Sequence, residues 1–213
     1  MLNVDDPQYK LPEQNFFTHF GKMFKDNKGL RKISMRQHRL RFEGVSILTY
    51  YLQDNSYLEV LDLSANQICF QGMMYLSEYL ESTKTLKSII LAGNKIKEAG
   101  IENYNLFLIG AKHFARGIYK NQSIVHVDLT NNSINNEGLC RIAEGLSTNN
   151  FVQSLKIFLN NEWGDESISM FKTLLSNKGT DFYPDFVIYE TETLETDIAY
   201  LETHIKNEED YLV

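Results

Sequence analysis

Residues 58–80, LEVLDLSANQICFQGMMYLSEYL, decide the fold of this chain. Apolar residues spaced for one face of a strand come first, an asparagine follows them, and a glycine opens a segment with leucines four apart. The pattern is carried by Leu58, Leu61, Leu63, Asn66, Ile68, Gly72, Leu76 and Leu80. The same frame returns 28 residues earlier from Leu30 and 28 residues later from Leu86, and it resumes at Ile124 and Val152. A fixed period of this length predicts a solenoid of stacked units.

Each unit has a strand half and a helix half. Apolar residues alternate in the first half and recur four apart in the second, where they share one side of a helix. Burial of the seven or so apolar side chains of one unit gains roughly 1.5–3 kcal/mol each, whereas fixing the backbone of all its 28 residues costs roughly 1–2 kcal/mol per residue. One unit is therefore unstable alone, and stacking is required. The asparagine of each unit should be buried and bridge backbone groups of adjacent turns.

These residues resemble leucine-rich repeats of the ribonuclease-inhibitor type, and the resemblance covers about residues 12 to 180. It implies an α/β leucine-rich-repeat solenoid, a horseshoe arc with a parallel sheet on the concave face and helices on the convex face. About five repeats plus caps are expected. Known members mostly bind other proteins, so the resemblance also implies an interaction module.

The chain of 213 residues is expected to form one domain, 1–213. We divide it into an N-terminal helical cap (1–29), repeats (30–180) with an insertion at 101–110, and an acidic C-terminal cap (181–213). The N-terminal helix should bury one face against the first strand. That face comprises Phe16, Phe17, Phe20, Met23 and Phe24.

Two departures from the frame lie near the C-terminus. A one-residue bulge in the last unit places Trp163 at a position that should be largely buried. After it, residues 186–189 predict a closing strand. The spacing of Leu194, Ile198, Leu201 and Ile205 then predicts a final amphipathic helix, which either covers the last strand or docks on a partner.

Composition favours a reducing, cytoplasmic setting. The N-terminus does not read as a secretory signal, and no apolar run is long enough to span a membrane. The two cysteines, Cys69 and Cys140, fall two strands apart, beyond the roughly 7 Å limit of a disulfide, so both are expected to be reduced. A cilium or the cytoskeleton is the more specific location we consider.

Charge is distributed unevenly along the chain. The net charge is −7, yet residues 22–41 hold eight bases and one acid, and residues 181–213 hold ten acids and one base. One end of the solenoid should be positive and the other negative. The basic end, with Lys32, Arg36 and Arg39, is expected to face an acidic surface of another protein; solvated caps without a specific role are the alternative.

The insertion is the most informative departure, because six of its ten residues are apolar. Insertions at a solenoid turn usually project from the rim and are polar. We expect its apolar residues either to extend the helix and pack back or to form a partner-binding surface. On the concave face the centre (Ser88, Ile90, Ala92) is small enough to receive a partner. The candidate partner-binding residues are Lys32, Arg36, Arg39, Tyr104, Leu106, Phe107, Leu108 and Phe158.

Other chemistries are disfavoured. His126, Ser154 and Asp128 should lie near one another on adjacent strands, but an open sheet lacks the dry pocket and oxyanion donors that a nucleophile needs. The sequence has no phosphate-binding loop and no metal-ligand spacing among its two cysteines and five histidines. Overall acidity argues against nucleic acid as a partner. We therefore expect no enzyme, cofactor, metal, nucleic-acid or membrane-binding function.

The sequence thus predicts a protein–protein interaction scaffold, a small structural or assembly subunit of a larger intracellular complex. The resemblance leaves open a regulator of a small GTPase, because the Ran GTPase-activating protein carries the same repeats. A hydrolase that uses His126 is a third hypothesis.

Overall fold

The structure is a computed structural model that describes residues 12–94, 104–160, 163–190 and 196–200; side chains are described from Phe16 onward, except in residues 104–108, Glu190 and residues 196–200. Helices and strands alternate along the chain. The elements are α1 (Pro12–Asp26), β1 (Lys32–Ser34), α2 (Arg41–Leu52), β2 (Val60–Asp62), α3 (Phe70–Ser82), β3 (Ser88–Ile90), α4 (Tyr104–Lys120), β4 (His126–Asp128), α5 (Asn136–Ser147), β5 (Ser154–Lys156), α6 (Asp165–Lys178), a 3₁₀ turn (Gly179–Asp181), β6 (Tyr183–Pro184), β7 (Phe186–Glu190) and β8 (Thr196–Tyr200).

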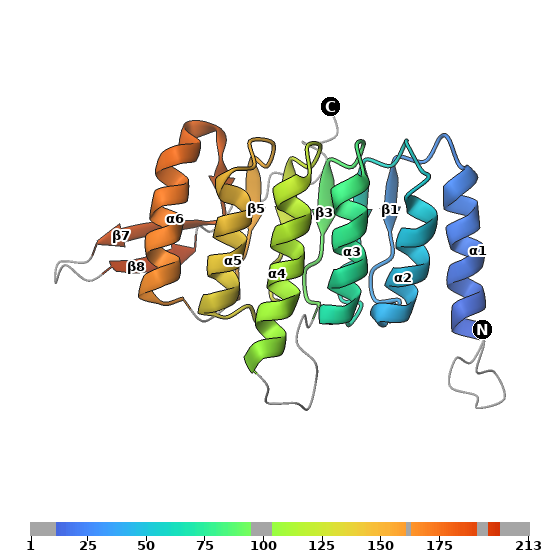
Figure 1. The fold of residues 1–213 in the computed structure, drawn as a ribbon, viewed down its shortest axis with the longest axis horizontal. Helices are drawn as coiled ribbons and strands as arrows, with labels where there is room; N and C mark the ends of the chain where they lie inside the picture. The colour runs from blue at the N-terminus through green and yellow to red at the C-terminus, as the bar shows by residue number, and fades with distance from the viewer. Residues whose placement is uncertain (1–11, 95–103, 161–162, 191–195, 201–213) are drawn as a thin grey trace.

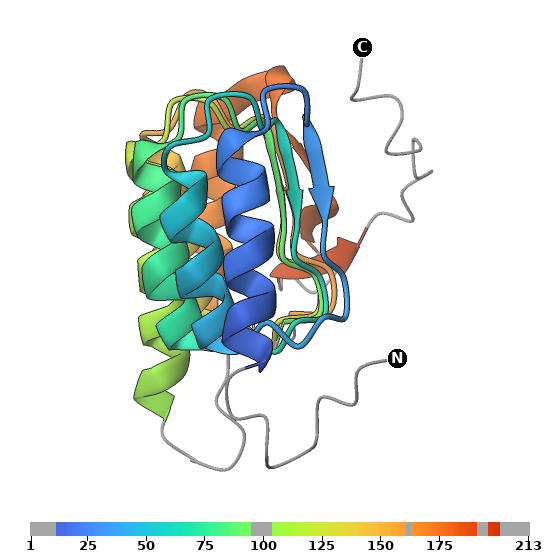
Figure 2. The same cartoon turned by 90° about the vertical axis from the view of Figure 1, so that its right-hand side faces the viewer.

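The strands and helices form two layers, seen edge-on in Figure 2. Strands β1 to β6 make one parallel sheet in sequence order, and the helices cover one face of it (Figure 1). The register follows the sequence frame, since Lys32 pairs with Val60, Val60 with Ser88, Ser88 with His126 and His126 with Ser154. This confirms the predicted α/β leucine-rich-repeat solenoid and same-direction strands.

The core lies between the two layers and is filled by the repeating apolar positions. Leu58, Leu61 and Leu63 of the second unit are at most 1% exposed, as are their counterparts Leu86, Ile89 and Leu91 in the third. These side chains pack on the units to either side, because each strand and helix borders its counterpart in the next unit. Burial is shared between neighbours, as the stacking argument requires.

The buried asparagines bridge adjacent turns, as predicted. Asn94 Nδ2 donates to Leu63 O at 2.8 Å and to Leu91 O at 2.9 Å, and its Oδ1 accepts from the N–H of Asn66 at 2.8 Å. Asn160 Oδ1 accepts in the same way from the N–H groups of Asn132 and Ile134. The column therefore supplies hydrogen bonds to backbone N–H and C=O groups in the turns. These groups are buried and have no partner on a neighbouring strand.

A second column of asparagines, which was not predicted from the sequence, runs along the opposite rim. Asn55 Nδ2 donates to Phe24 O at 2.7 Å, and its Oδ1 accepts from the N–H groups of Tyr57 and Leu58. Asn121 and Asn149 repeat this arrangement in later units. The signal was present in the sequence, because Asn27 and Asn55 lie 28 residues apart, as do Asn121 and Asn149.

Lys178 ends this second column. Its ammonium donates to Asn149 O and Val152 O, the place that an asparagine amide occupies in earlier units. Burial lowers the pKa of Lys178, since its amine is partly removed from water. The lysine thus has a structural role where the repeats stop.

Helix α1 packs beside α2 at the N-terminal end of the row (Figure 1). Phe17 and Phe24 are buried and Phe20 is half-buried, but Phe16 and Met23 are 41% and 50% exposed. The expectation that all five apolar residues face the core is therefore wrong for Phe16 and Met23. The reason is geometric: nothing in the described part of the chain flanks the outer side of this helix.

The C-terminal end differs from the prediction. Residues 186–190 are a strand, but β7 leaves the parallel sheet and pairs antiparallel with β8, with Ile188 opposite Ile198. Residues 196–200 are therefore a strand where an amphipathic helix was predicted, and that expectation is wrong; Leu194, Leu201 and Ile205 lie outside the described residues. Trp163 is half-buried and packs on Phe171 and Phe186, with ring centroids 5.1 and 5.2 Å away.

Candidate protein-binding surfaces

Helix α4 begins earlier than its neighbours because of the insertion. Gly72, Gly110 and Gly138 hold the same place in the frame, and α3 and α5 begin two residues before it, at Phe70 and Asn136. Helix α4 begins at Tyr104, which is four residues earlier in this frame. Four residues make about one helical turn, roughly 6 Å long. The first turn of α4 therefore projects beyond the row of helices, as Figure 1 shows.

Three predicted site residues form this projecting turn. Tyr104, Leu106 and Phe107 belong to it, and Leu108 holds the position at which α3 and α5 begin. The side chains of these four residues lie outside what the structure describes, as do residues 101–103 of the predicted insertion. Residues 104–110 are helical, so the insertion extends the helix.

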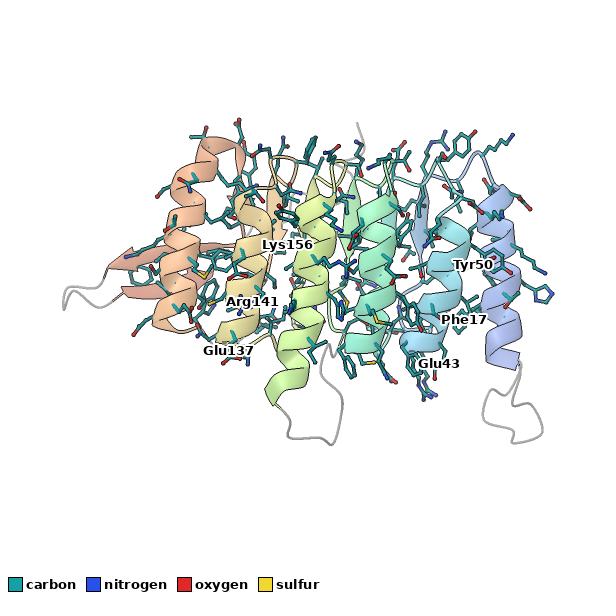
Figure 3. All side chains as sticks on the ribbon, in the orientation of Figure 1. Phe17, Glu43, Tyr50, Glu137, Arg141 and Lys156 are labelled. Carbon is teal, nitrogen blue, oxygen red and sulfur yellow. The ribbon has the colours of Figure 1, made fainter. Side chains whose placement is uncertain are left out.

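The projecting turn lies at the rim where strands end and helices begin. Glu43 and Glu137 mark the same rim, in the first turns of α2 and α5 (Figure 3). Their carboxylates lie near the partly positive helix N-termini, a favourable placement. The turn of the first unit also lies on this rim and holds the predicted Arg36 and Arg39, both exposed.

The basic end is partly neutralised by acids of the first and second units. Arg36 lies 3.6 Å from the Asp62 carboxylate, Lys25 pairs with Asp54 at 2.6 Å and Arg31 with Glu59 at 3.4 Å. Lys32, the first residue of the outer strand β1, is exposed. The sequence count of eight bases and one acid missed these pairs, because their acids lie outside the basic segment.

Phe158 lies at the far end of the molecule from the basic residues. It follows β5, is 42% exposed and is followed by the 44% exposed Leu159. Strands β1 and β5 are separated by three others, hence by roughly 19 Å at about 4.8 Å per strand. The predicted site residues therefore occupy separate surfaces rather than one patch.

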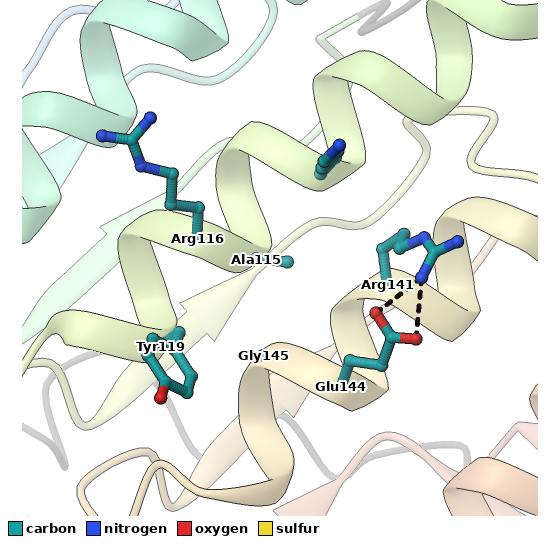
Figure 4. Close-up of a pocket in the computed structure, with 7 residues that line it drawn as sticks. Ala115, Arg116, Tyr119, Arg141, Glu144 and Gly145 are labelled. Carbon is teal, nitrogen blue, oxygen red and sulfur yellow. Dashed lines mark hydrogen bonds and ion pairs between the residues drawn. The ribbon is translucent and has the colours of Figure 1, made fainter.

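A groove between α4 and α5 on the helical face was not foreseen from the sequence (Figure 4). Its volume is about 440 Å³. Small residues form its floor, since Gly145 packs so close to Ala115 that an added Cβ would lie 2.6 Å from Ala115 O. Its lining comprises Lys112, Ala115, Arg116, Tyr119, Arg141, Glu144 and Gly145. A glycine inside a predicted amphipathic helix was the available signal.

Cations outnumber anions around this groove, and ion pairs fix several of them. Arg141 Nη1 contacts both carboxylate oxygens of Glu144, at 2.8 and 2.9 Å (Figure 4). Arg116 and Lys120 both bind Glu81, at 2.6 and 2.8 Å. Burial alone would raise the pKa of Glu81, but hydrogen bonds from Lys120 and Arg116 lower it below its usual value. The groove presents an exposed aromatic ring, Tyr119, between fixed cations.

The sheet face offers less room than expected. Ile90 is only 7% exposed, and Ser88 and Ala92 are half-buried. Little side-chain surface is therefore available at this centre for a partner to contact. His126 Nδ1 lies 2.8 Å from Ser154 Oγ, as their pairing on adjacent strands implied. Asp128 instead accepts a hydrogen bond from the N–H of Thr130. His126 and Ser154 are therefore in contact, on a sheet face rather than in an enclosed pocket.

Metal-binding clusters and membrane-spanning helices are absent from the described part of the chain. Within the described residues, no group of three or more histidine, cysteine, aspartate or glutamate side chains could hold a metal ion. None of the helices that the structure describes is long and apolar enough to cross a membrane. Both cysteines are free thiols, Cys140 buried and Cys69 half-buried.

The parallel sheet, the helical layer and the repeated asparagine turns define a leucine-rich-repeat fold. A family model described as Leucine Rich repeat matches residues 54–77 and 120–143. No curated protein matches the chain. Among solved structures, it is similar to one titled "Leiomodin-1 Actin-Binding Site 2 (ABS2)", with 15% identity and a TM-score of 0.57, covering 77% of this chain and 88% of that one.

It is also similar to the tropomodulin C-terminal domain of Caenorhabditis elegans, with 13% identity and a TM-score of 0.55. That match covers 77% of this chain and 92% of the other. At such identities the likeness establishes the fold alone.

Proposed function

We propose that this chain is a protein-binding scaffold, a small structural or assembly subunit that contacts other proteins of a multi-subunit complex. The projecting turn of α4 carries this proposal. It places Tyr104, Leu106 and Phe107 beyond the ends of the neighbouring helices. Apolar residues at such a position are better suited to contact with another protein than to exposure to water. The apolar residues of the regular units are buried between neighbouring units. The surfaces that remain for binding are the rim, the two ends and the groove between α4 and α5.

The basic end is the second part of the proposal. Lys32, Arg36 and Arg39 are exposed there, and an acidic surface of a partner suits them. The repeat period of 28 residues with a full helix in each unit supports assignment to the ribonuclease-inhibitor type. We place the protein in the cytoplasm, with the cytoskeleton or a cilium as the specific setting.

Actin is the first partner to test, because the similar leiomodin structure is described as an actin-binding site. Co-sedimentation of the purified chain with actin filaments, and its binding to actin monomers, would measure this directly. The GTPase-regulator alternative predicts faster GTP hydrolysis when the chain is added to cell-extract fractions. Stimulated hydrolysis without stable complexes would favour that alternative over the scaffold.

The projecting turn is tested by Leu106→Ser, Phe107→Ser and Leu108→Ser together, in pull-downs from the native cell. We expect partners to be lost while the melting temperature stays near that of the parent. Leu106→Ser with Phe107→Ser alone is the milder variant, because both residues lie in the extra turn. Tyr50→Ser, an exposed aromatic on α2 outside the groove and away from the projecting turn, is the matched control. Unchanged partners in a folded variant would remove the case for this surface.

A further inference from the structure

The outer flank of α1 is an apolar surface at the N-terminal end of the solenoid. On its inner side, Gly21 packs against the Tyr51 ring and Lys25 pairs with Asp54, so α2 borders that side. Phe16, Phe20 and Met23 are spaced i, i+4 and i+7 and lie on the opposite flank. The Phe16 and Phe20 rings are in tilted contact with centroids 4.6 Å apart, and Met23 is half exposed. This flank faces away from the helical row (Figure 1).

The opposite end carries a hairpin that projects beyond α6. Strands β7 and β8 form a separate two-stranded sheet, drawn at the far left of Figure 1. One face of β7 closes the core through Phe186, which packs on Phe171 at 5.3 Å. The other face presents Val187 and Tyr189, which are 40% and 43% exposed. Tyr183 of β6, the last strand of the parallel sheet, is also exposed at this end, at 62%.

Within the described part of the chain, neither end has the packing that such elements normally need. A two-stranded sheet is marginal in water unless another surface covers it. A terminal unit of a solenoid needs a polar outer face, yet α1 presents Phe16 and Met23. Each end therefore has an apolar surface that a further layer of packing would cover.

Charge makes the two ends complementary. Residues 22–41 at the N-terminal end hold eight bases and one acid, whereas the described residues at the other end, 181–190 and 196–200, hold four acids and no base. Three of those bases pair within the molecule, with Asp54, Glu59 and Asp62, which leaves the segment basic. Like ends would repel each other, and unlike ends attract.

We propose that the chain associates head to tail with a second copy of itself, the hairpin end of one copy docking on the outer flank of α1 in the next. This inference rests on the proposed function, because it names the partner of the basic end. The contact joins two different surfaces, so it leaves one free end of each kind. Copies add in sequence, as repeats do within the chain.

The first test is sedimentation velocity of the purified chain alone over a wide range of concentration. We expect a series of species that grows with concentration. Raising the salt shortens the Debye length from about 10 Å at 0.1 M to about 3 Å at 1 M and should weaken association about tenfold. A chain that stays monomeric at every concentration in low salt would overturn the proposal. The scaffold function would survive that result, because pull-downs test it separately.

The second test separates head-to-tail from symmetric pairing. The N-end variant carries Lys22→Glu and Met23→Glu, and the C-end variant carries Tyr183→Lys and Val187→Lys, all at exposed positions. Each variant alone should associate at least about tenfold more weakly than the parent. Mixed together, they should form a dimer and nothing larger, because each retains the end that the other has lost.

The control is Tyr119→Glu, an exposed aromatic on α4 away from both ends, which should associate like the parent. Circular dichroism melts check that all variants are folded. Dimers formed by one end variant alone would show symmetric pairing and overturn the head-to-tail contact. A mixture that stays monomeric, while the parent associates, would also overturn it.

Discussion

Asn94 joins two neighbouring repeats through one side chain. Its carboxamide oxygen accepts from Asn66 and Ile68 of the preceding unit, and its nitrogen donates to Leu63 of that unit and Leu91 of its own. All of these groups are out of reach of water, and Asn94 itself has no exposed surface. A side-chain amide carries two donor hydrogens and an acceptor oxygen in one plane, so a single asparagine can serve all four groups.

Asn94→Ala should therefore destabilise the protein by at least about 3 kcal/mol, since each orphaned buried polar group costs about 1–3 kcal/mol. Urea unfolding measures the change as a lower midpoint at an unchanged slope. Asn150→Ala, at an exposed position, is the control and should lie within about 0.5 kcal/mol of the parent. Parent-like unfolding of Asn94→Ala would show that the asparagine column is not needed.

The buried phenol of Tyr79 should make the protein less stable in alkali. It is 1% exposed, and burial raises its pKa to about 12. Between the ordinary pKa of about 10 and this value, the unfolded chain releases the phenol proton and the folded chain keeps it. Stability should therefore fall as the pH rises through that window.

Tyr79→Phe should remove this part of the alkaline decline. It should also be neutral or stabilising by about 1 kcal/mol at pH 7, because the Tyr79 hydroxyl has no hydrogen-bond partner among the described residues. Unfolding free energies at neutral and alkaline pH, for parent and variant, provide the measurement. A variant that loses stability with pH as steeply as the parent would assign the decline to other groups.

The length and spacing of elements were largely predictable where the repeat is regular. The burial of Leu58, Leu61 and Asn66 can be predicted from their position in the repeat, because the same position is buried in every unit. The strand at 196–200 was not predictable in this way. Ile198 fits a helical spacing with Leu194 and Leu201, but as a β-branched residue it also fits a strand. Its pairing with Ile188 decides between them, and that contact is not local.

The close contact between α4 and α5 depends on a glycine, Gly145, which has no side chain. Gly145→Ala would place a Cβ 2.6 Å from Ala115 O and 2.9 Å from Ala115 Cα. The two helices must then separate, which costs about 1–3 kcal/mol and outweighs a gain in helix propensity of about 1 kcal/mol.

Thermal unfolding of Gly145→Ala should show a lower midpoint. Ser147→Ala, at the exposed last residue of the same helix, loses only a hydrogen bond to Glu144 O and should stay within about 0.5 kcal/mol of the parent. If Gly145→Ala proves stabilising, the helices can shift apart without loss, and the close approach does not fix the groove.

Across the whole molecule, the candidate surfaces were only partly predictable. The apolar insertion and the uneven charge could be read from the sequence, because both are local features of composition. The ion pairs of Arg36 and Lys25, and the groove floored by Ala115 and Gly145, could not. They depend on which residues of adjacent units face each other, and that follows from the register of the stack.

The stack itself predicts how substitutions combine. Asn66 and Asn94 lie in adjacent units and share a hydrogen bond through the Asn66 N–H, whereas Asn66 and Asn160 are separated by two intervening units. In a solenoid, energies are carried by nearest neighbours. Asn66→Ala with Asn94→Ala should therefore depart from additivity by about 0.5–3 kcal/mol, and Asn66→Ala with Asn160→Ala should add within about 0.5 kcal/mol. Urea unfolding of the singles and doubles gives both numbers. Equal coupling in the near and distant pairs would mean that strain spreads through the entire chain, contrary to a structure built from contacts between successive repeats.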